Sequence, residues 1–129
     1  MNAERSAKPS AVALLLAVLS ALAGPLDLIV SNPPYIPSGD IANLSVEVRD
    51  YDPRLALDGG NDGFDAYRAL IPQAAQLLAP GGALVVEAGQ GQARGIETLM
   101  AASALEVERP PKADLAGVLR AVSARKMPP

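Results

Sequence analysis

The feature that most constrains the fold is a short apolar stretch that two prolines bring to an end. Residues 26–30 read Leu-Asp-Leu-Ile-Val, and Ser31-Asn32-Pro33-Pro34-Tyr35 follow directly. A short apolar run of this kind is typical of a strand that is buried on both faces, as in a parallel sheet. Proline has no N–H to give to a neighbouring strand, so we expect the chain to turn here. Residues 36–63 are rich in Pro, Asp, Gly and Asn and predict a long loop.

The rest of the chain alternates between helical and strand patterns. Apolar residues recur at three- and four-residue spacing over residues 64–78 and predict a helix, which Pro72 either kinks or divides in two. Residues 83–88 predict a second buried strand, residues 89–91 a tight turn and residues 93–100 another helix. Residues 105–109 and 118–125 predict two last strands, joined by a loop that contains Pro110-Pro111. This order predicts an α/β fold with a mainly parallel sheet and a C-terminal antiparallel hairpin.

The N-terminal stretch has two interpretations. Arg5 and Lys8 precede an apolar run over residues 11–19, and Ala21-Leu22-Ala23 has the small-x-small form of a signal-peptidase site. The run is too short to cross a bilayer as a helix. We interpret residues 12–22 as a buried helix, because the segment that follows has the pattern of an internal strand of a cytoplasmic enzyme.

Composition excludes several kinds of chemistry. The 129 residues, enough for one modest domain, include no Cys and no His. Thiol catalysis, structural zinc sites and histidine general bases are therefore excluded. The net charge is −3 and no block of like charge occurs, so we expect no direct contact with nucleic acid. Because the apolar run near the N-terminus is too short to span a bilayer, we expect no membrane partner either.

The Asn-Pro-Pro-Tyr sequence indicates chemistry on a planar nitrogen. In an open α/β sheet, ligands bind beyond the carboxyl ends of the strands, which is where Asn32 is expected. Pro33 and Pro34 fix the local backbone, so Asn32 Oδ1 and the Pro33 carbonyl can form two fixed acceptors for one –NH2 group. Tyr35 can pack against the planar group that carries this nitrogen. The alternative is a purely structural proline turn, but the full tetrapeptide after a buried strand favours methyl transfer without a strong base.

Longer stretches around this sequence resemble one family. The similarity to release-factor glutamine methyltransferases of the PrmC/HemK type covers about residues 19–125. The tetrapeptide alone is shared by many amino methyltransferases, and the Arg-Leu-Ala-Leu-Asp-Gly-Gly stretch is what narrows the resemblance to this family. The segments that carry it are residues 27–37, Glu47-Val48-Arg49, residues 52–60, Asp62-Gly63, Asp65-Ala66-Tyr67-Arg68, residues 78–82 and Asp114-Leu115-Ala116-Gly117.

The resemblance implies a fold, a reaction and a set of site residues. The fold would be the C-terminal half of a Rossmann-like S-adenosylmethionine-dependent methyltransferase, with residues 1–25 an atypical apolar segment and residues 26–129 a partial methyltransferase domain. The cofactor would be S-adenosyl-L-methionine, and the substrate a glutamine amide in the Gly-Gly-Gln loop of a peptide chain release factor, in the cytoplasm. Asn32, Pro33, Pro34 and Tyr35 would be catalytic, with Asn32, Pro33 and Tyr35 binding substrate, Asn32 also contacting cofactor, and no metal.

The chain departs from the family pattern in front of Leu26. The family's helical substrate-recognition domain, its Gly-rich cofactor loop and the acidic strand end that holds the ribose are not found there, so we expect an N-terminally truncated chain that is itself inactive.

Other interpretations remain open. The chain could act on a glutamine of a ribosomal protein or on adenine in nucleic acid, or it could be an inactive methyltransferase remnant. Gly89-Gln90-Gly91 could be the cofactor loop of a circularly permuted enzyme, although the family has a similar turn without that role. We expect Arg49, Arg54 and Arg68 to form structural ion pairs with Asp50, Asp58 or Asp65.

Overall fold

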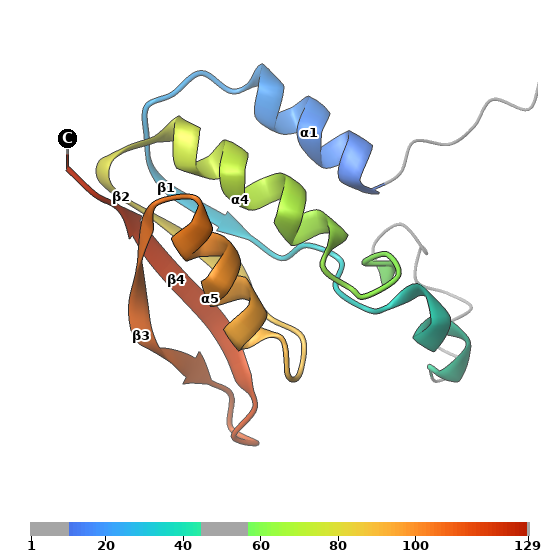
Figure 1. Cartoon of the computed structure of the whole chain (residues 1–129). Helices are drawn as coiled ribbons and strands as arrows, with labels where there is room; N and C mark the ends of the chain where they lie inside the picture. Colours follow the sequence, from blue (N-terminus) through green and yellow to red (C-terminus); the bar gives the residue numbers. More distant parts are fainter. Residues whose placement is uncertain (1–10, 45–56, 129) are drawn as a thin grey trace, which may run out of the picture.

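The computed structural model describes residues 11–44 and 57–128, and these residues form a sheet with helices against it (Figure 1). Residues 45–56 contain Glu47-Val48-Arg49, Asp50, Arg54 and part of the Arg-Leu-Ala-Leu-Asp-Gly-Gly stretch, so the expectations for them lie outside the described residues. The elements in chain order are α1 (Ala11–Ala21), β1 (Leu26–Ser31), the short 3-10 helix η1 (Ser38–Asn43), α4 (Asp65–Leu77), β2 (Leu78–Glu87), α5 (Ala93–Ala102), β3 (Leu105–Ala113) and β4 (Leu119–Lys126).

The sheet has four strands in the order β1-β2-β4-β3. Strands β1 and β2 are parallel, with Ile29 opposite Leu84 and Ser31 opposite Val86. Strand β4 is antiparallel to both β2 and β3, so the predicted C-terminal hairpin is confirmed. The α/β fold class is confirmed as well, although only one of the three pairings among the described strands is parallel.

One face of the sheet carries the core. Because successive side chains of a strand point to opposite faces, Leu84 and Val86 of β2 share a face with Val122 and Ala124 of β4. These four side chains belong to one buried cluster together with apolar residues of α4 and α5: Tyr67, Leu70, Ile71, Ala74, Ile96 and Met100. Helices α4 and α5 therefore cover the same face of the sheet.

The opposite face of the sheet corrects an expectation. We expected β1 to be buried on both faces, but Leu28 is 58% exposed and Val30 is 68% exposed. Strand β1 lies at one edge of the sheet, and no helix of the described residues covers the face to which Leu28 and Val30 belong. The apolar sequence of β1 correctly predicts a strand. Whether that strand is buried depends on the elements that pack against it, and its own sequence does not determine them.

Proline positions account for two further differences. Helix α4 continues through Pro72 as a single helix, so of the two alternatives the division into two helices is wrong. Pro72 is exposed, where water can satisfy the carbonyl that loses its helical partner. Pro110 and Pro111 lie inside β3 and not in the loop after it, which the turn at Asp114 forms instead. Strand β3 tolerates them because it is an edge strand and its register shifts between Glu108 and Lys112.

Strand β2 begins earlier than its apolar pattern suggested. Its first residue, Leu78, follows α4 without a loop and pairs with Leu26 of β1. The register then shifts, so that the next paired residues are Leu28 and Ala83. This irregularity accommodates Ala79-Pro80-Gly81-Gly82, which lies within β2 just after the end of α4.

Helix α1 confirms the helix expected over residues 12–22 and lies beside α4 (Figure 1). Its Leu19 is 5% exposed and belongs to the core cluster, whereas Val18 and Leu22 are exposed. Among residues 16–21, the part of the helix whose side chains are described, Leu19 is the buried one. The division of the chain between residues 25 and 26 stays a prediction. None of the helices in the described ranges is both long and apolar enough to cross a membrane.

Candidate functional site

The Asn-Pro-Pro-Tyr segment leaves the sheet at the carboxyl end of β1. Ser31, the last residue of β1, pairs with Val86, and β2 ends one residue later. Because β1 and β2 are parallel, their carboxyl ends meet at the same edge of the sheet. Asn32 is exposed there, Pro33 is buried, and Pro34 and Tyr35 are half-buried. The expected place of the segment, beyond the end of a strand, is confirmed.

A hollow of about 730 Å³ lies beside Asn32. Its walls come from residues 30–32 of β1 and the segment after it, residues 85–87 of β2, and Arg120 and Ala121 of β4. Val30 and Val85 contribute apolar surface, whereas Asn32, Glu87 and Arg120 contribute polar groups. Residues that are almost 90 positions apart in the sequence, Asn32 and Arg120, thus border one hollow.

Arg120 is held in place by contacts to two segments. Its Nε donates to Asp114 Oδ2 at 3.1 Å and its Nη1 donates to the Ala88 carbonyl at 3.3 Å. The hydrogen bond with Asp114 raises the pKa of Arg120 further above its usual value. The carboxylate of Asp114 accepts hydrogen bonds from the Val118 and Ala116 N–H groups as well, and the bond from Val118 contributes most to lowering its pKa. The side chain at the hollow is therefore a fixed cation.

Tyr35 is tightly packed between the loop before α4 and the turn after β2. A Cβ atom on Gly63 would lie 2.4 Å from the Tyr35 carbonyl oxygen, and Gly63 has a φ of +84° that other residues rarely adopt. A Cβ atom on Gly89 would lie 2.5 Å from Cδ1 of the Tyr35 ring. The ring therefore lies directly on the backbone of Gly89, which follows the carboxyl end of β2.

The segment after Tyr35 pairs with the loop that leads to α4. The Ile36 N–H donates to the Leu57 carbonyl at 3.1 Å, and the Gly59 N–H donates back to the Ile36 carbonyl at 2.8 Å. The Ser38 N–H donates to the Gly60 carbonyl at 2.8 Å. These backbone bonds hold the two ends of the long loop together close to Tyr35.

Gln92 connects the three segments around Tyr35. Its side chain is buried, with the residue 8% exposed. Its Oε1 accepts from the Gly89 N–H at 3.0 Å, and its Nε2 donates to the Tyr35 carbonyl at 2.9 Å and to the Gly63 carbonyl at 3.4 Å. One side chain thus joins the β2–α5 turn, the segment after β1 and the loop before α4.

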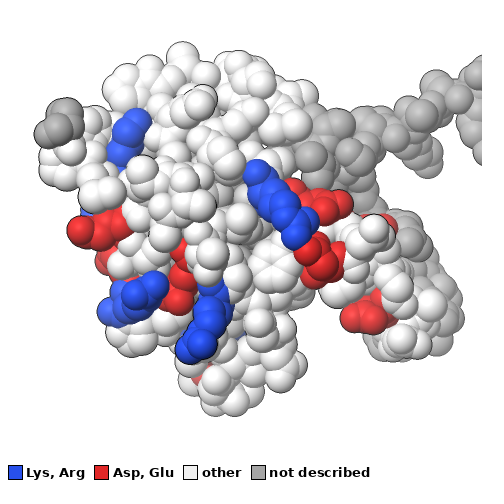
Figure 2. All heavy atoms as spheres, viewed as in Figure 1, with Lys and Arg blue, Asp and Glu red and all other residues white. Residues whose placement is uncertain are grey.

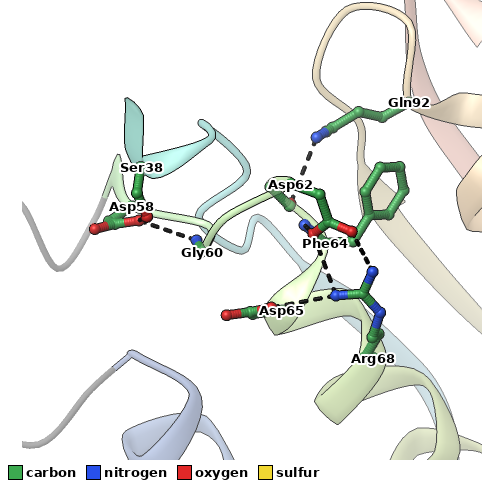
Figure 3. Close-up of polar contacts among 9 residues, drawn as sticks. Ser38, Asp58, Gly60, Asp62, Phe64, Asp65, Arg68 and Gln92 are labelled. Carbon is green, nitrogen blue, oxygen red and sulfur yellow. Dashed lines mark hydrogen bonds and ion pairs between the residues drawn. The ribbon is translucent and has the colours of Figure 1, made fainter. Parts of the chain in front are cut away.

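Acidic side chains fix the loop before α4 (Figure 3). Asp58 Oδ1 accepts from the Ser38 hydroxyl at 2.6 Å and from the Gly60 N–H at 2.9 Å. Asp62 accepts from the Phe64 N–H at 2.9 Å and from the Arg68 guanidinium, whose hydrogen bond is the main cause of the lowered pKa of Asp62. The loop is therefore shaped by local hydrogen bonds.

The charges of this region form pairs. The expected ion pair between Arg68 and Asp65 is confirmed, with an N–O distance of 3.2 Å. On the face shown in Figure 2, basic side chains lie beside acidic ones and form no block. Among residues 11–44 and 57–128 no group of three or more acidic side chains is arranged to hold a metal ion.

Tyr67 of α4 supports the site from the core. It is fully buried, as expected for the inner face of its helix, and its hydroxyl donates to the Glu87 carbonyl at 2.6 Å. Burial raises the pKa of this hydroxyl, so it stays protonated and keeps its role as a donor. The bond joins α4 to the last residue of β2, next to the turn that carries the Tyr35 ring.

At the turn Gly89-Gln90-Gly91, the first backbone donor already has a partner within the chain. The Gly89 N–H is taken by Gln92 Oε1, and the Tyr35 ring lies on the Gly89 backbone. The turn is closed by the Gln92 N–H, which donates to the Gly89 carbonyl at 3.1 Å. These contacts favour a structural role for the turn over that of a permuted cofactor loop.

Three side chains near the tetrapeptide were not recognised from the sequence. Glu87 and Arg120 border the hollow because β2 and β4 pair, which the sequence does not specify. Gln92 occupies the position before α5, where short polar residues are usual, and its side chain makes no cap bond to its own helix. The one feature of the sequence that could have indicated a special role for Gln92 is its long amide side chain at this position.

The chain is similar in sequence to several proteins that share one name. It is 70% identical to the release factor glutamine methyltransferase of Bradyrhizobium diazoefficiens over 138 aligned positions, which cover 100% of this chain and 46% of that protein. It is 55% identical to the Rhodospirillum rubrum protein of the same name, covering 83% of this chain and 33% of that protein. The chain therefore spans less than half the length of these relatives. No family model matches the sequence.

Solved structures agree with the fold. A Thermus thermophilus protein assigned as a DNA modification methylase superposes with a TM-score of 0.58 over 89% of this chain and 52% of that one, at 17% identity, which shows the fold alone. A release-factor-specific protein-(glutamine-N5) methyltransferase of Alicyclobacillus acidocaldarius superposes with a TM-score of 0.50 at 27% identity, over 89% of this chain and 56% of that one. The fold is that of the S-adenosylmethionine-dependent methyltransferases, and by its sequence the chain belongs to the release factor glutamine methyltransferase family.

Proposed function

We propose that this chain supplies the amide-binding part of an enzyme that methylates a glutamine side chain of a peptide chain release factor, with S-adenosyl-L-methionine as methyl donor. The observation that carries the proposal is the position of the Asn32–Tyr35 segment at the carboxyl end of β1, bordering a hollow of about 730 Å³. The names of relatives that are 70% and 55% identical support the choice of substrate.

The residues of this chain have separate parts in the proposed reaction. The Asn32 Oδ1 atom and the Pro33 carbonyl each accept a hydrogen bond from one N–H of the glutamine amide. Pro34 fixes the backbone between these acceptors and Tyr35. The Tyr35 ring packs against the amide plane. An amide nitrogen is a weak nucleophile because its lone pair is delocalised, and the two acceptors favour the pyramidal geometry in which that pair becomes available.

The hollow beside Asn32 is suited to one part of the cofactor. S-adenosylmethionine, when bound, supplies an electrophilic methyl group. Val30 and Val85 offer apolar surface and Asn32 an amide, next to the charged groups of Glu87 and Arg120, and such a mixed lining suits a ligand that is partly apolar and partly charged. These residues fit one wall of a cofactor site, with Asn32 at the boundary between cofactor and substrate.

Product identification tests the proposed function. Because the chain spans 46% of the Bradyrhizobium diazoefficiens relative, we would replace the matched segment of that protein by residues 1–129 and assay the purified chimera. Mass spectrometry should find one methyl group on the glutamine of a release factor's Gly-Gly-Gln loop. A glutamine-containing ribosomal protein and adenine-containing DNA are the comparison substrates, and methylation of either in place of the release factor would contradict the proposal.

We also propose that the protein acts in the cytoplasm without removal of residues 1–23. Leu19 supports this, because its side chain is part of the core that α4 and the sheet form. N-terminal sequencing of protein expressed in a bacterium should begin at or next to Met1. A sequence that begins at Gly24 would show a working signal peptide instead.

A further inference from the structure

Gln92 makes a set of contacts that the proposed reaction does not yet use. It is buried, it is uncharged, and its amide contacts three backbone groups, two of which belong to segments that are distant in the sequence. The Tyr35 carbonyl lies 57 residues away and the Gly63 carbonyl 29 residues away. A buried side chain that satisfies a donor in one segment and acceptors in two others fixes their relative positions.

The chemistry of the contacts requires a carboxamide. The Gly89 N–H needs an acceptor and the Tyr35 carbonyl needs a donor, and Oε1 and Nε2 of one glutamine provide both. A glutamate would keep the acceptor but bring a second oxygen against the Tyr35 carbonyl. A leucine would fill the space and leave both backbone groups without partners.

The two glycines beside the Gln92 amide have no room for a Cβ atom of their own. A Cβ atom on Gly89 would lie 2.5 Å from Gln92 Oε1, and one on Gly63 would lie 2.7 Å from Gln92 Nε2. The same two glycines are the ones that contact the ring and the carbonyl of Tyr35. Gln92, Gly63 and Gly89 therefore form a single seat for Tyr35.

We propose that Gln92 is a positioning residue that acts through Tyr35: it fixes the Tyr35 backbone against the carboxyl end of β2 so that the ring is held ready for the substrate amide. The inference rests on the proposed function, in which the Tyr35 ring packs on the amide plane. Gln92 touches neither substrate nor cofactor in this arrangement.

Kinetics of the chimera test the inference with a double-mutant cycle. Gln92→Leu should lower kcat about tenfold to a hundredfold, because a displacement of about 1 Å at a reacting group costs on that order. The KM for the release factor should change by less than about threefold. In a Tyr35→Ala background the same Gln92→Leu change should have almost no further effect, since the group through which it acts is gone. Gln76→Leu, on the exposed side of α4, is the matched control.

A measurement on the 129-residue chain tests the contacts without activity. The Gly89 N–H should exchange slowly with solvent in the original chain, because Gln92 Oε1 holds it. Gln92→Glu should keep this protection while losing turnover in the chimera, whereas Gln92→Leu should lose both.

The outcomes separate the inference from the proposed function. If the chimera is active and Gln92→Leu leaves its kcat unchanged, the positioning role is overturned and the proposed function stands. The same holds if Gln92→Leu lowers kcat by an equal factor in the Tyr35 chimera and in the Tyr35→Ala chimera. A folded chimera that methylates no release factor overturns the proposed function, and the role of Gln92 with it. Fast exchange of the Gly89 N–H in the original chain overturns the inference independently of any assay.

Discussion

The close contact between Gly89 and Tyr35 gives a prediction whose size can be worked out from the structure. In Gly89→Ala the new Cβ atom would lie 2.5 Å from Tyr35 Cδ1 and 2.5 Å from Gln92 Oε1, where ordinary contacts begin at 3.4 Å. The ring and the amide would both have to move by about 0.9 Å. Gly89 does not have a positive φ, so the effect is one of space and not of backbone strain.

Two costs add up in this variant. Forcing a methyl group into a filled site costs about 1–3 kcal/mol. Moving Gln92 away from the Gly89 N–H weakens a hydrogen bond worth about 0.5–1.5 kcal/mol. We therefore expect the free energy of unfolding of the 129-residue chain to fall by about 1.5–4.5 kcal/mol, measured by urea denaturation at equilibrium.

Gly39→Ala is the matched control. Gly39 lies in η1, has no positive φ, and a Cβ atom there would meet nothing within 4 Å. Its substitution should change the free energy of unfolding by less than about 0.5 kcal/mol apart from a small gain from lost chain entropy. If Gly89→Ala is as stable as Gly39→Ala, the Tyr35 ring does not rest on Gly89 and the seat described above is wrong.

Three other properties of the chain can be checked. Tyr67→Phe removes the donor to the buried Glu87 carbonyl and should lower the free energy of unfolding by about 1–3 kcal/mol at neutral pH, measured in urea. Burial raises the pKa of Tyr67 above its unfolded value of 10.0, so the original chain should lose stability as the pH rises above that value, and the Phe variant should lose less of it. Leu28→Thr with Val30→Thr should reduce self-association of the chain in light scattering, because it removes exposed apolar surface from an edge strand, and unchanged association would contradict this. The 129-residue chain should bind S-adenosylmethionine only weakly in isothermal titration, because the hollow beside Asn32 provides one wall for it, and micromolar binding would contradict that view.

The patterns in the sequence were sufficient for most of the local structure. Apolar spacing over residues 64–78 and 93–100 corresponds to α4 and α5, and the runs near residues 26 and 83 correspond to β1 and β2. These patterns succeed because each reflects a property of a single segment, namely which of its sides is apolar. The place of Asn32 followed from the same logic, since a strand that ends in two prolines must turn where they begin.

What could not be predicted depends on pairings between segments. Leu28 and Val30 have a sequence suited to burial, yet their exposure is decided by the absence of a helix over that face among the described residues. Pro110 looked like a loop residue because its tolerance in β3 depends on an edge position and a shifted register. Gln92 carries no motif, and its importance became visible only when Tyr35 and Gly63 were found within reach of its amide.

The rate of release factor methylation by an Asn32→Ala chimera tests the central claim most directly. Asn43→Ala, which changes an exposed asparagine of η1, is the matched control, and titration of both variants with S-adenosylmethionine separates chemistry from cofactor binding. If Asn32 Oδ1 holds the substrate amide, Asn32→Ala should slow methylation about a hundredfold or more and change cofactor affinity little, while Asn43→Ala behaves like the parent chimera. Near-normal turnover of Asn32→Ala would contradict the amide-binding role on which the account depends.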